Sequence, residues 1–168
     1  MAAGIGLVPE DRRQQGLVMS SSITRNIALA SLRRLSRLGF IRGSMETTFA
    51  ADWAIKLQMR YGRLANPVSS LSGGNQQKVV IAKSLIQKPK LVIFDEPTRG
   101  VDVGAIVEIH RFINELADDG IAVVVISSYL PEVLALSDRI LIARQGRIVE
   151  EMDISEATEA KIMYAAVH

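Results

Sequence analysis

The side chains best suited to chemistry lie in one short stretch, between residues 71 and 102. Two adjacent acids, Asp95 and Glu96, follow an apolar run over residues 91–94 that reads as a buried strand of a parallel sheet. Open α/β sheets bind ligands at the carboxyl ends of such strands. A carboxylate there can bind a hard cation such as Mg²⁺, or act as a general base toward water. The alternative is that both acids are solvated at a strand end.

A second candidate site precedes that strand. Ser72 can cap a helix predicted over residues 75–87, and Gly73 and Gly74 leave the backbone at its start open to close approach. Free N–H groups and the positive end of the helix dipole make such a point suitable for an anion. Taken alone, a Ser-Gly-Gly turn is usually only a turn.

The composition narrows the class of protein. A chain of 168 residues with 48% hydrophobic and 23% charged residues can form a globular core. The lack of cysteine excludes disulfides and thiolate metal sites, and the two histidines lie far apart in the sequence. A net charge of +2 does not indicate nucleic-acid binding. No apolar run reaches the roughly 18–20 residues needed to span a bilayer, and the first residues do not read as a secretory signal, so we expect a cytoplasmic protein.

The elements that must position these residues alternate in type. Strands are predicted over 4–8, 91–95, 121–127, 139–143 and 147–150, and helices over 22–38, 45–61, 75–87, 105–118, a short segment from 131, and 155–167. This alternation predicts an α/β fold with a parallel sheet. We divide the chain into a helical subdomain (22–66), an α/β core (67–152) and a carboxyl-terminal helix (153–168).

Together, LSGGNQQK at residues 71–78 and DEPTRGVD at residues 95–102 resemble the signature motif and Walker B strand of ABC-type ATPases. They are most similar to the ATP-binding subunits of bacterial sugar importers of the ribose, galactose and xylose type. The resemblance runs from Gly4 to about Met152 and looks like the carboxyl-terminal part of a second nucleotide-binding half. It implies a partial P-loop NTPase sheet with a helical subdomain.

The resemblance assigns a role to each acid. Asp95 matches the aspartate that contacts Mg²⁺, usually through water, and Glu96 matches the catalytic glutamate that orients or deprotonates the attacking water. Asp102 lies in the loop that crosses to the partner domain, although it could instead cap the following helix.

The signature residues receive a different role from the resemblance. Ser72, Gly73 and Gly74 match the motif that grips the γ-phosphate of ATP bound on the opposite domain of a head-to-tail dimer, and Gln76 follows it. Lys78 is expected to be a solvated helix residue.

Two positions depart from the family pattern. Ser128 stands where the switch histidine would be, and serine can donate a hydrogen bond to phosphate but cannot take up a proton near neutral pH. Glu10 occupies the position of the Q-loop glutamine, near where Mg²⁺ would lie. Arg12 and Arg13 are expected to be solvated loop residues.

The sequence contains no Gly-Lys dipeptide, so it has no phosphate loop of the form G-x-x-x-x-G-K-[ST]. We therefore expect the chain alone to bind ATP weakly. Loss of the phosphate-loop strand would expose apolar edges at residues 91–94 or 121–126, which predicts that the chain self-associates or rearranges to cover them.

The resemblance implies ATP and Mg²⁺ as cofactors and a peripheral location on the inner face of the cell membrane. Its implied partners are a membrane-spanning permease, a second nucleotide-binding half and, indirectly, a periplasmic sugar-binding protein. The favoured hypothesis is part of an ATPase subunit that powers import of a sugar or a related solute. The alternatives are a non-catalytic half that lends its signature loop to a partner, and an ABC ATPase acting on DNA or ribosomes.

Overall fold

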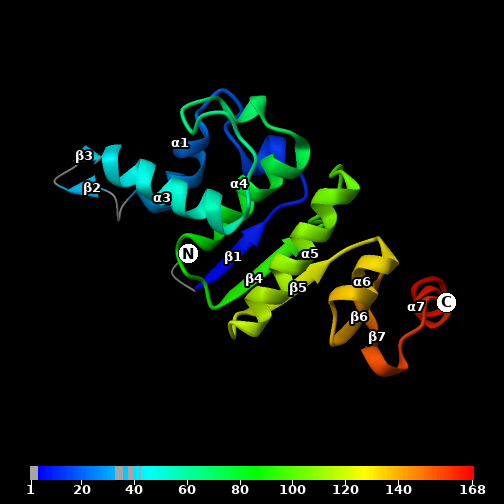
Figure 1. Cartoon of the computed structure of the whole chain (residues 1–168). Helices are drawn as coiled ribbons and strands as arrows, with labels where there is room; N and C mark the ends of the chain where they lie inside the picture. The colour runs from blue at the N-terminus through cyan, green and yellow to red at the C-terminus, as the bar shows by residue number, and fades with distance from the viewer. Residues whose placement is uncertain (1–3, 33–35, 38–39, 42) are drawn as a thin grey trace. The chain divides into compact units, whose positions relative to one another are not determined.

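The structure is a computed structural model that describes residues 4–32, 36–37, 40–41 and 43–168. The chain divides into a first unit, Met1–Val124, and a second unit, Val125–His168. The first unit contains β1 (Ile5–Val8), η1 (Arg12–Gly16), α1 (Ile23–Ala28), η2 (Leu29–Ser31), β2 (Ser36–Arg37), β3 (Phe40–Ile41), α3 (Gly43–Lys56), η3 (Val68–Ser70), α4 (Gly73–Leu85), β4 (Leu91–Asp95) and α5 (Val103–Asp118) (Figure 1). β5 (Ala122–Ile126) contains the boundary.

The main sheet has the order β1-β4-β5. β1 and β4 are parallel, with Ile5 opposite Leu91 and Val8 opposite Phe94. The predicted α/β fold with a parallel sheet is therefore confirmed. Of the two edges that the sequence predicted, the one at residues 91–94 is wrong, because β4 has a neighbour on each side. The other, at residues 121–126, contains β5, which with β1 is an outer strand of this sheet among the described residues.

One face of the sheet packs against α4. Val8, Val92 and Phe94 are buried, and the Ser84 hydroxyl of α4 donates a hydrogen bond of 2.7 Å to the Leu7 carbonyl of β1. α4 is buried along most of its length, as expected for a helix that packs on several sides. The opposite side of β1 is open, since Ile5 and Leu7 are 46% and 53% exposed.

The helical part begins as predicted, but its helices are shorter. Ser22 is the cap of α1, because its hydroxyl accepts a hydrogen bond from the Arg25 N–H at 3.2 Å. The predicted helix over residues 22–38 is wrong at residues 36–37, which pair with residues 40–41 in an antiparallel ladder. Leu38 lies outside the described residues. α1 contacts both α3 and α4 (Figure 1).

The predicted helix over residues 45–61 ends at Lys56 rather than Tyr61. Gln58 has a φ of +50°, a left-handed conformation that stops a right-handed helix. Its carbonyl oxygen then accepts a hydrogen bond of 3.1 Å from the Lys78 ammonium. Local hydrogen bonds close this end, from the Met59 N–H to the Ala54 carbonyl at 2.8 Å and from the Gln58 N–H to the Ile55 carbonyl at 2.9 Å.

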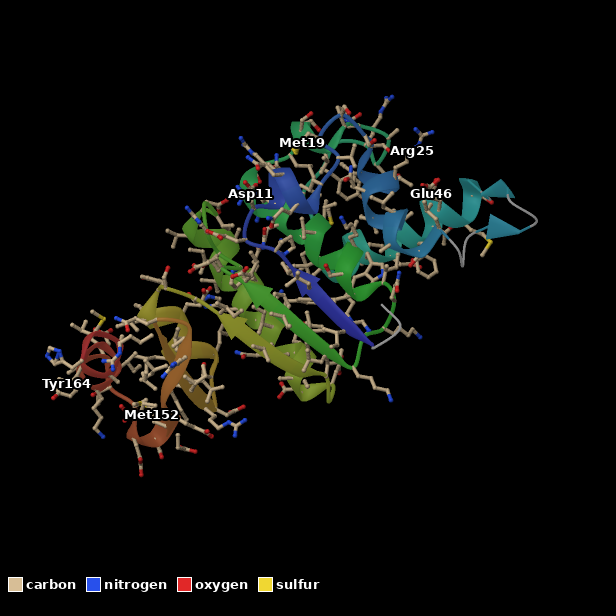
Figure 2. The ribbon with its side chains drawn as sticks, turned by 180° about the vertical axis from the view of Figure 1, so that it is seen from behind. Asp11, Met19, Arg25, Glu46, Met152 and Tyr164 are labelled. Atoms are coloured by element: carbon tan, nitrogen blue, oxygen red, sulfur yellow. The ribbon has the colours of Figure 1, made fainter. Side chains whose placement is uncertain are left out.

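The second unit contains α6 (Leu130–Leu136), β6 (Arg139–Arg144), β7 (Arg147–Asp153), η4 (Ile154–Glu156) and α7 (Glu159–Val167). The predicted hairpin across Gln145 and Gly146 is present, with both residues at positive φ. Its core contains Ile140, Ile142, Met152, Ile162 and Ala165; Met152 lies on β7, and Tyr164 on α7 is mostly exposed (Figure 2).

The last helix begins later than predicted. Ser155 does not open it, because the Asp153 carboxylate accepts hydrogen bonds from both the N–H and the hydroxyl of Ser155 and closes a short 3₁₀ turn. The cap of α7 is Thr158, whose hydroxyl accepts from the Lys161 N–H at 3.3 Å. None of the helices in the described part of the chain is long and apolar enough to cross a membrane.

Candidate functional site

The acid pair lies where the sequence placed it. Asp95 is the last residue of β4, and Glu96 follows in the left-handed region at φ +45°. A non-glycine residue there costs on the order of 1 kcal/mol, so the surrounding turn must enforce it. The Glu96 carbonyl accepts from the Arg99 N–H at 3.1 Å, and Gly100 has a φ of +66°. The turn therefore holds both carboxylates at the carboxyl end of the sheet.

The metal assignment depends on a single carboxylate. Among the described residues, no group of three or more histidine, aspartate or glutamate side chains could hold a metal ion. Mg²⁺ bound through nucleotide phosphates keeps several waters and takes one or two protein carboxylates, so a half-buried Asp95 fits that mode of binding. Its role as a metal ligand stays a prediction.

The turn at the start of α4 is capped as expected. The Ser72 hydroxyl accepts from the Asn75 N–H at 3.4 Å and from the Asn75 side chain at 3.0 Å. The first N–H groups of a helix have no acceptor within the helix, so those of Gly73 and Gly74 can meet an anion. Gln76 is buried, and its side-chain N–H donates to the Leu71 carbonyl at 3.0 Å. Gln76 therefore secures the loop before the helix.

Close packing also explains why positions 73 and 74 are glycine. A Cβ on Gly74 would lie 2.4 Å from the Cβ of Ala105 on α5, and a Cβ on Gly73 would lie 2.8 Å from the Gly100 carbonyl oxygen. Both distances are too short for any side chain. The glycine pair is thus required where the start of α4 meets α5 and the turn after β4, whether or not a ligand binds.

Asp102 caps α5, which was one of its two predicted roles. Its carboxylate accepts from the Ala105 N–H at 3.0 Å. Asp102 also lies near Gly74, since a Cβ on that glycine would be 3.3 Å from a carboxylate oxygen of Asp102. A contact from this loop to a partner domain stays a prediction.

The segment after β1 contains contacts that the sequence did not predict. It forms the π-helical turn η1 rather than a loop, and Asp11 caps this turn (Figure 2). The Glu10 carboxylate forms an ion pair with Arg99. The Arg12 guanidinium donates to the carbonyl oxygens of Arg99 at 2.8 Å and Gly100 at 3.0 Å, and burial lowers the pKa of Arg12.

The expectation that Arg12 is solvated is therefore wrong, while its neighbour Arg13 is exposed as expected. Glu10 was predicted to lie near Mg²⁺, and this remains a prediction beside its observed pairing with Arg99.

The prediction for Lys78 is also wrong. Its side chain is only 4% exposed, and its ammonium donates to the Glu108 carboxylate of α5 at 2.5 Å and to the Gln58 carbonyl. The hydrogen bond from Lys78 lowers the pKa of Glu108. The predicted solvated helix residue is instead a link between α4, α5 and the end of α3.

Most of the predicted site residues therefore lie in the first unit. They occupy the turn after β4 and the turn at the start of α4, which are in contact. Ser128 is exposed and belongs to the second unit, so its role at a phosphate site stays a prediction. Arg12 was missed because it binds backbone carbonyl oxygens, which no residue pattern reveals.

Comparisons with known proteins identify the family. The family model described as ABC transporter matches residues 2–99, more than half of the chain. The ribose import ATP-binding protein RbsA of Rhodococcus jostii is 56% identical over 166 residues, which cover 99% of this chain and 33% of that protein. The xylose import ATP-binding protein XylG of Moorella thermoacetica is 49% identical, with 99% and 33% covered. The chain spans about a third of the length of these curated relatives.

A solved structure has the same fold. A dimeric ATP-binding cassette bound to ADP and phosphate in a post-hydrolysis state matches with a TM-score of 0.73 at 22% identity, over 89% of this chain and 62% of that one. The structural match shows the fold, and the family model and the curated relatives show the family. This chain belongs to the ABC transporter family.

Proposed function

We propose that this chain forms part of the ATP-hydrolysing subunit that powers import of a sugar, or a related small polar solute, through an ABC transporter. The observation that carries the proposal is the meeting of two turns in one unit. The turn after β4 presents Asp95 and Glu96, and the capped start of α4 presents the N–H groups of Gly73 and Gly74. The similarity to ribose and xylose import proteins supports sugars as the class of solute.

Each of these residues would have a separate role in ATP hydrolysis. Asp95 would hold Mg²⁺, which neutralises phosphate charge when bound. Glu96 would accept a hydrogen bond or a proton from the attacking water. Ser72 and the α4 turn would donate hydrogen bonds to the γ-phosphate of a nucleotide held by the other half of a dimer, and Ser128 would donate one in place of the usual histidine.

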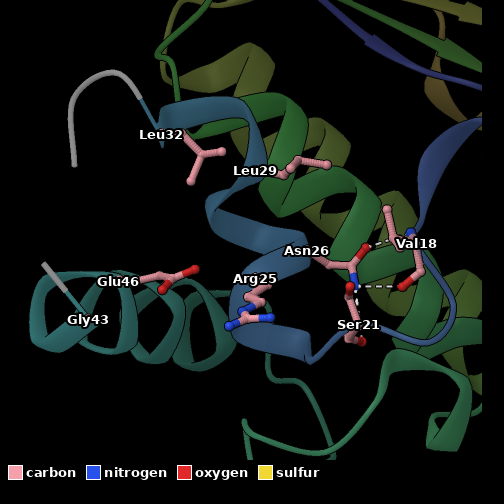
Figure 3. Close-up of a pocket in the computed structure, with 8 residues that line it drawn as sticks. All are labelled: Val18, Ser21, Arg25, Asn26, Leu29, Leu32, Gly43 and Glu46. Atoms are coloured by element: carbon pink, nitrogen blue, oxygen red, sulfur yellow. Dashed lines mark hydrogen bonds between the residues drawn. The ribbon is translucent and has the colours of Figure 1, made fainter. Parts of the chain in front are cut away.

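The surface that would receive the permease lies beside α1. A cavity of about 440 Å³ opens there between α1 and α3 (Figure 3). Its lining mixes apolar and charged side chains: Val18, Ser21, Arg25, Asn26, Leu29, Leu32, Gly43 and Glu46. Asn26 holds the preceding loop by hydrogen bonds to Val18 and Ser21 (Figure 3). A cytoplasmic segment of the permease with an apolar face and both charges at its edge fits this lining.

The first test is hydrolysis of magnesium-ATP by the full-length protein that carries this sequence. Glu96→Gln should lower kcat at least about a hundredfold and leave ATP binding intact, because the variant loses the base but keeps the other contacts. Glu150→Gln, at an exposed acid on β7, is the matched control and should hydrolyse ATP like the wild type. Equal hydrolysis by wild type and Glu96→Gln would disprove the catalytic assignment.

A second test separates the catalytic reading from a non-catalytic half. Calorimetry should show tight magnesium-ATP binding for the full-length protein and weak binding for the 168-residue chain, because the chain has no Gly-Lys phosphate loop. Micromolar binding by the short chain would mean that another phosphate site exists. Absence of hydrolysis in the full-length protein would favour a half that only lends its signature turn.

A further inference from the structure

Three parts of the first unit meet at the Arg12 side chain. Its guanidinium donates one hydrogen bond each to the carbonyl oxygens of Arg99 and Gly100, in the turn after β4. It also lies against the start of α4, because a Cβ on Gly73 would be 2.9 Å from a terminal nitrogen of Arg12. The planar fork of arginine suits this double contact, which a single ammonium cannot make with the same geometry.

The backbone of Arg12 is itself held firmly. The Asp11 carboxylate accepts from two N–H groups of η1 at 2.9 and 3.0 Å. At the other end of η1, Gly16 packs closely on Val80 of α4, and the Lys83 ammonium donates to the Gly16 carbonyl at 2.6 Å. η1 is therefore fixed to α4 at one end and, through Arg12, to the turn after β4 at the other.

We propose that Arg12 is a positioning residue that holds the turn at residues 99–102 against the start of α4, so that the acid pair and the signature turn keep one relative geometry. The Glu10–Arg99 ion pair joins the same two segments a second time. Arg12 does not touch the reacting atoms; it acts through the backbone of residues 99 and 100. The inference rests on the proposed function, since a fixed geometry between these turns matters for ATP hydrolysis.

The test compares Arg12→Lys with Arg13→Lys in the full-length protein assembled with its permease. Both variants keep their positive charge, and Arg13 is the exposed neighbour. Arg12→Lys should lower kcat for ATP about tenfold and change KM less than about twofold, because misplacing catalytic groups slows the chemical step more than it weakens binding. Arg13→Lys should change neither. Equal kcat for the two variants would overturn the proposal.

Hydrogen–deuterium exchange supplies a readout that does not need activity. Arg12→Lys should speed amide exchange at residues 72–76 and 99–102 and leave α3 unchanged. Slow exchange at both turns in Arg12→Lys would reject the positioning role. If the wild type does not hydrolyse ATP, the proposed function fails, and the exchange result still decides the role of Arg12. If Arg12→Lys and Arg12→Gln both fail to fold, Arg12 is needed for folding and the positioning role is rejected.

Discussion

Two clusters of charged side chains lie in the first unit, and they differ in burial and in what they touch. The helix cluster, Lys78 and Glu108, joins α4 to α5, and its lysine is only 4% exposed. The loop cluster, Glu10, Arg12 and Arg99, joins η1 to the turn after β4, and its ion pair is 41% exposed at Glu10 and 67% at Arg99. A buried charge must keep its partner, whereas an exposed pair can exchange its partner for water. We therefore expect the helix cluster to determine stability and the loop cluster to determine geometry.

The largest effect on stability should come from Lys78→Met in this chain. The variant keeps the apolar stem but removes the ammonium from Glu108 and from the Gln58 carbonyl. We expect a loss of about 2–3 kcal/mol in the free energy of unfolding, measured by urea denaturation, because the Gln58 carbonyl and the Glu108 carboxylate both lose a hydrogen bond from a charged donor. Arg60→Met is the control, since Arg60 is exposed and 4.0 Å from Glu108; it should cost less than about 0.5 kcal/mol. Similar losses for Lys78→Met and Arg60→Met would show that the helix cluster does not determine stability.

A second variant tests the packing where α4 meets α5. Gly74→Ala would place a Cβ 2.4 Å from the Ala105 Cβ, so the two helices must move apart. We expect a loss of about 1–3 kcal/mol from overpacking, measured by the same denaturation. Gly104→Ala is the matched control, because its Cβ would have no neighbour nearer than 3.6 Å; alanine there should be neutral or slightly stabilising. A neutral Gly74→Ala would show that this contact can relax.

The pH dependence of the free energy of unfolding tests whether Glu108 stabilises the fold through its pairing with Lys78. Its pKa is below the ordinary 4.5, mainly because of the hydrogen bond from Lys78. A carboxyl whose pKa is lower in the folded chain stabilises the fold above its unfolded pKa, and this contribution is lost as the pH falls through the folded value. The stability difference between the wild type and Glu108→Gln should therefore be constant near pH 7 and shrink below about pH 4.5. A difference that grows on acidification would contradict the assignment.

Of the two charged clusters, the loop cluster should contribute less to stability, which Glu10→Gln tests. This variant removes an exposed ion pair, and such pairs contribute less than about 1 kcal/mol. Arg139→Gln, which removes the exposed pair of Arg139 with Glu151 on the hairpin of the second unit, should have a similarly small effect. If Glu10→Gln cost as much as Lys78→Met, the division between the two clusters would be wrong.

The sequence could predict features that are local. The β4 strand, the caps at Ser72 and Asp102 and the hairpin at Gln145-Gly146 each follow from neighbouring residues, and the structure contains them. The end of α3 at Lys56 could not be predicted in the same way. Its cap has Gln58 in the left-handed position where glycine is usual, so the residue that normally signals a helix end is missing.

The same distinction applies to the site. Asp95 and Glu96 were visible because an apolar strand precedes them, and Lys78 was misjudged because a lysine in a helix is usually solvated. Its burial depends on the packing of α4 against α5, which a local pattern does not reveal.

The Arg12 contact has a consequence for how these positions change over evolution. Arg12 binds main-chain oxygens, and every amino acid supplies such an oxygen. Side chains at position 99 can therefore be replaced without any compensating change at position 12. These two positions touch but should not covary for that reason, whereas Glu10 and Arg99, which pair through their side chains, should exchange charges together.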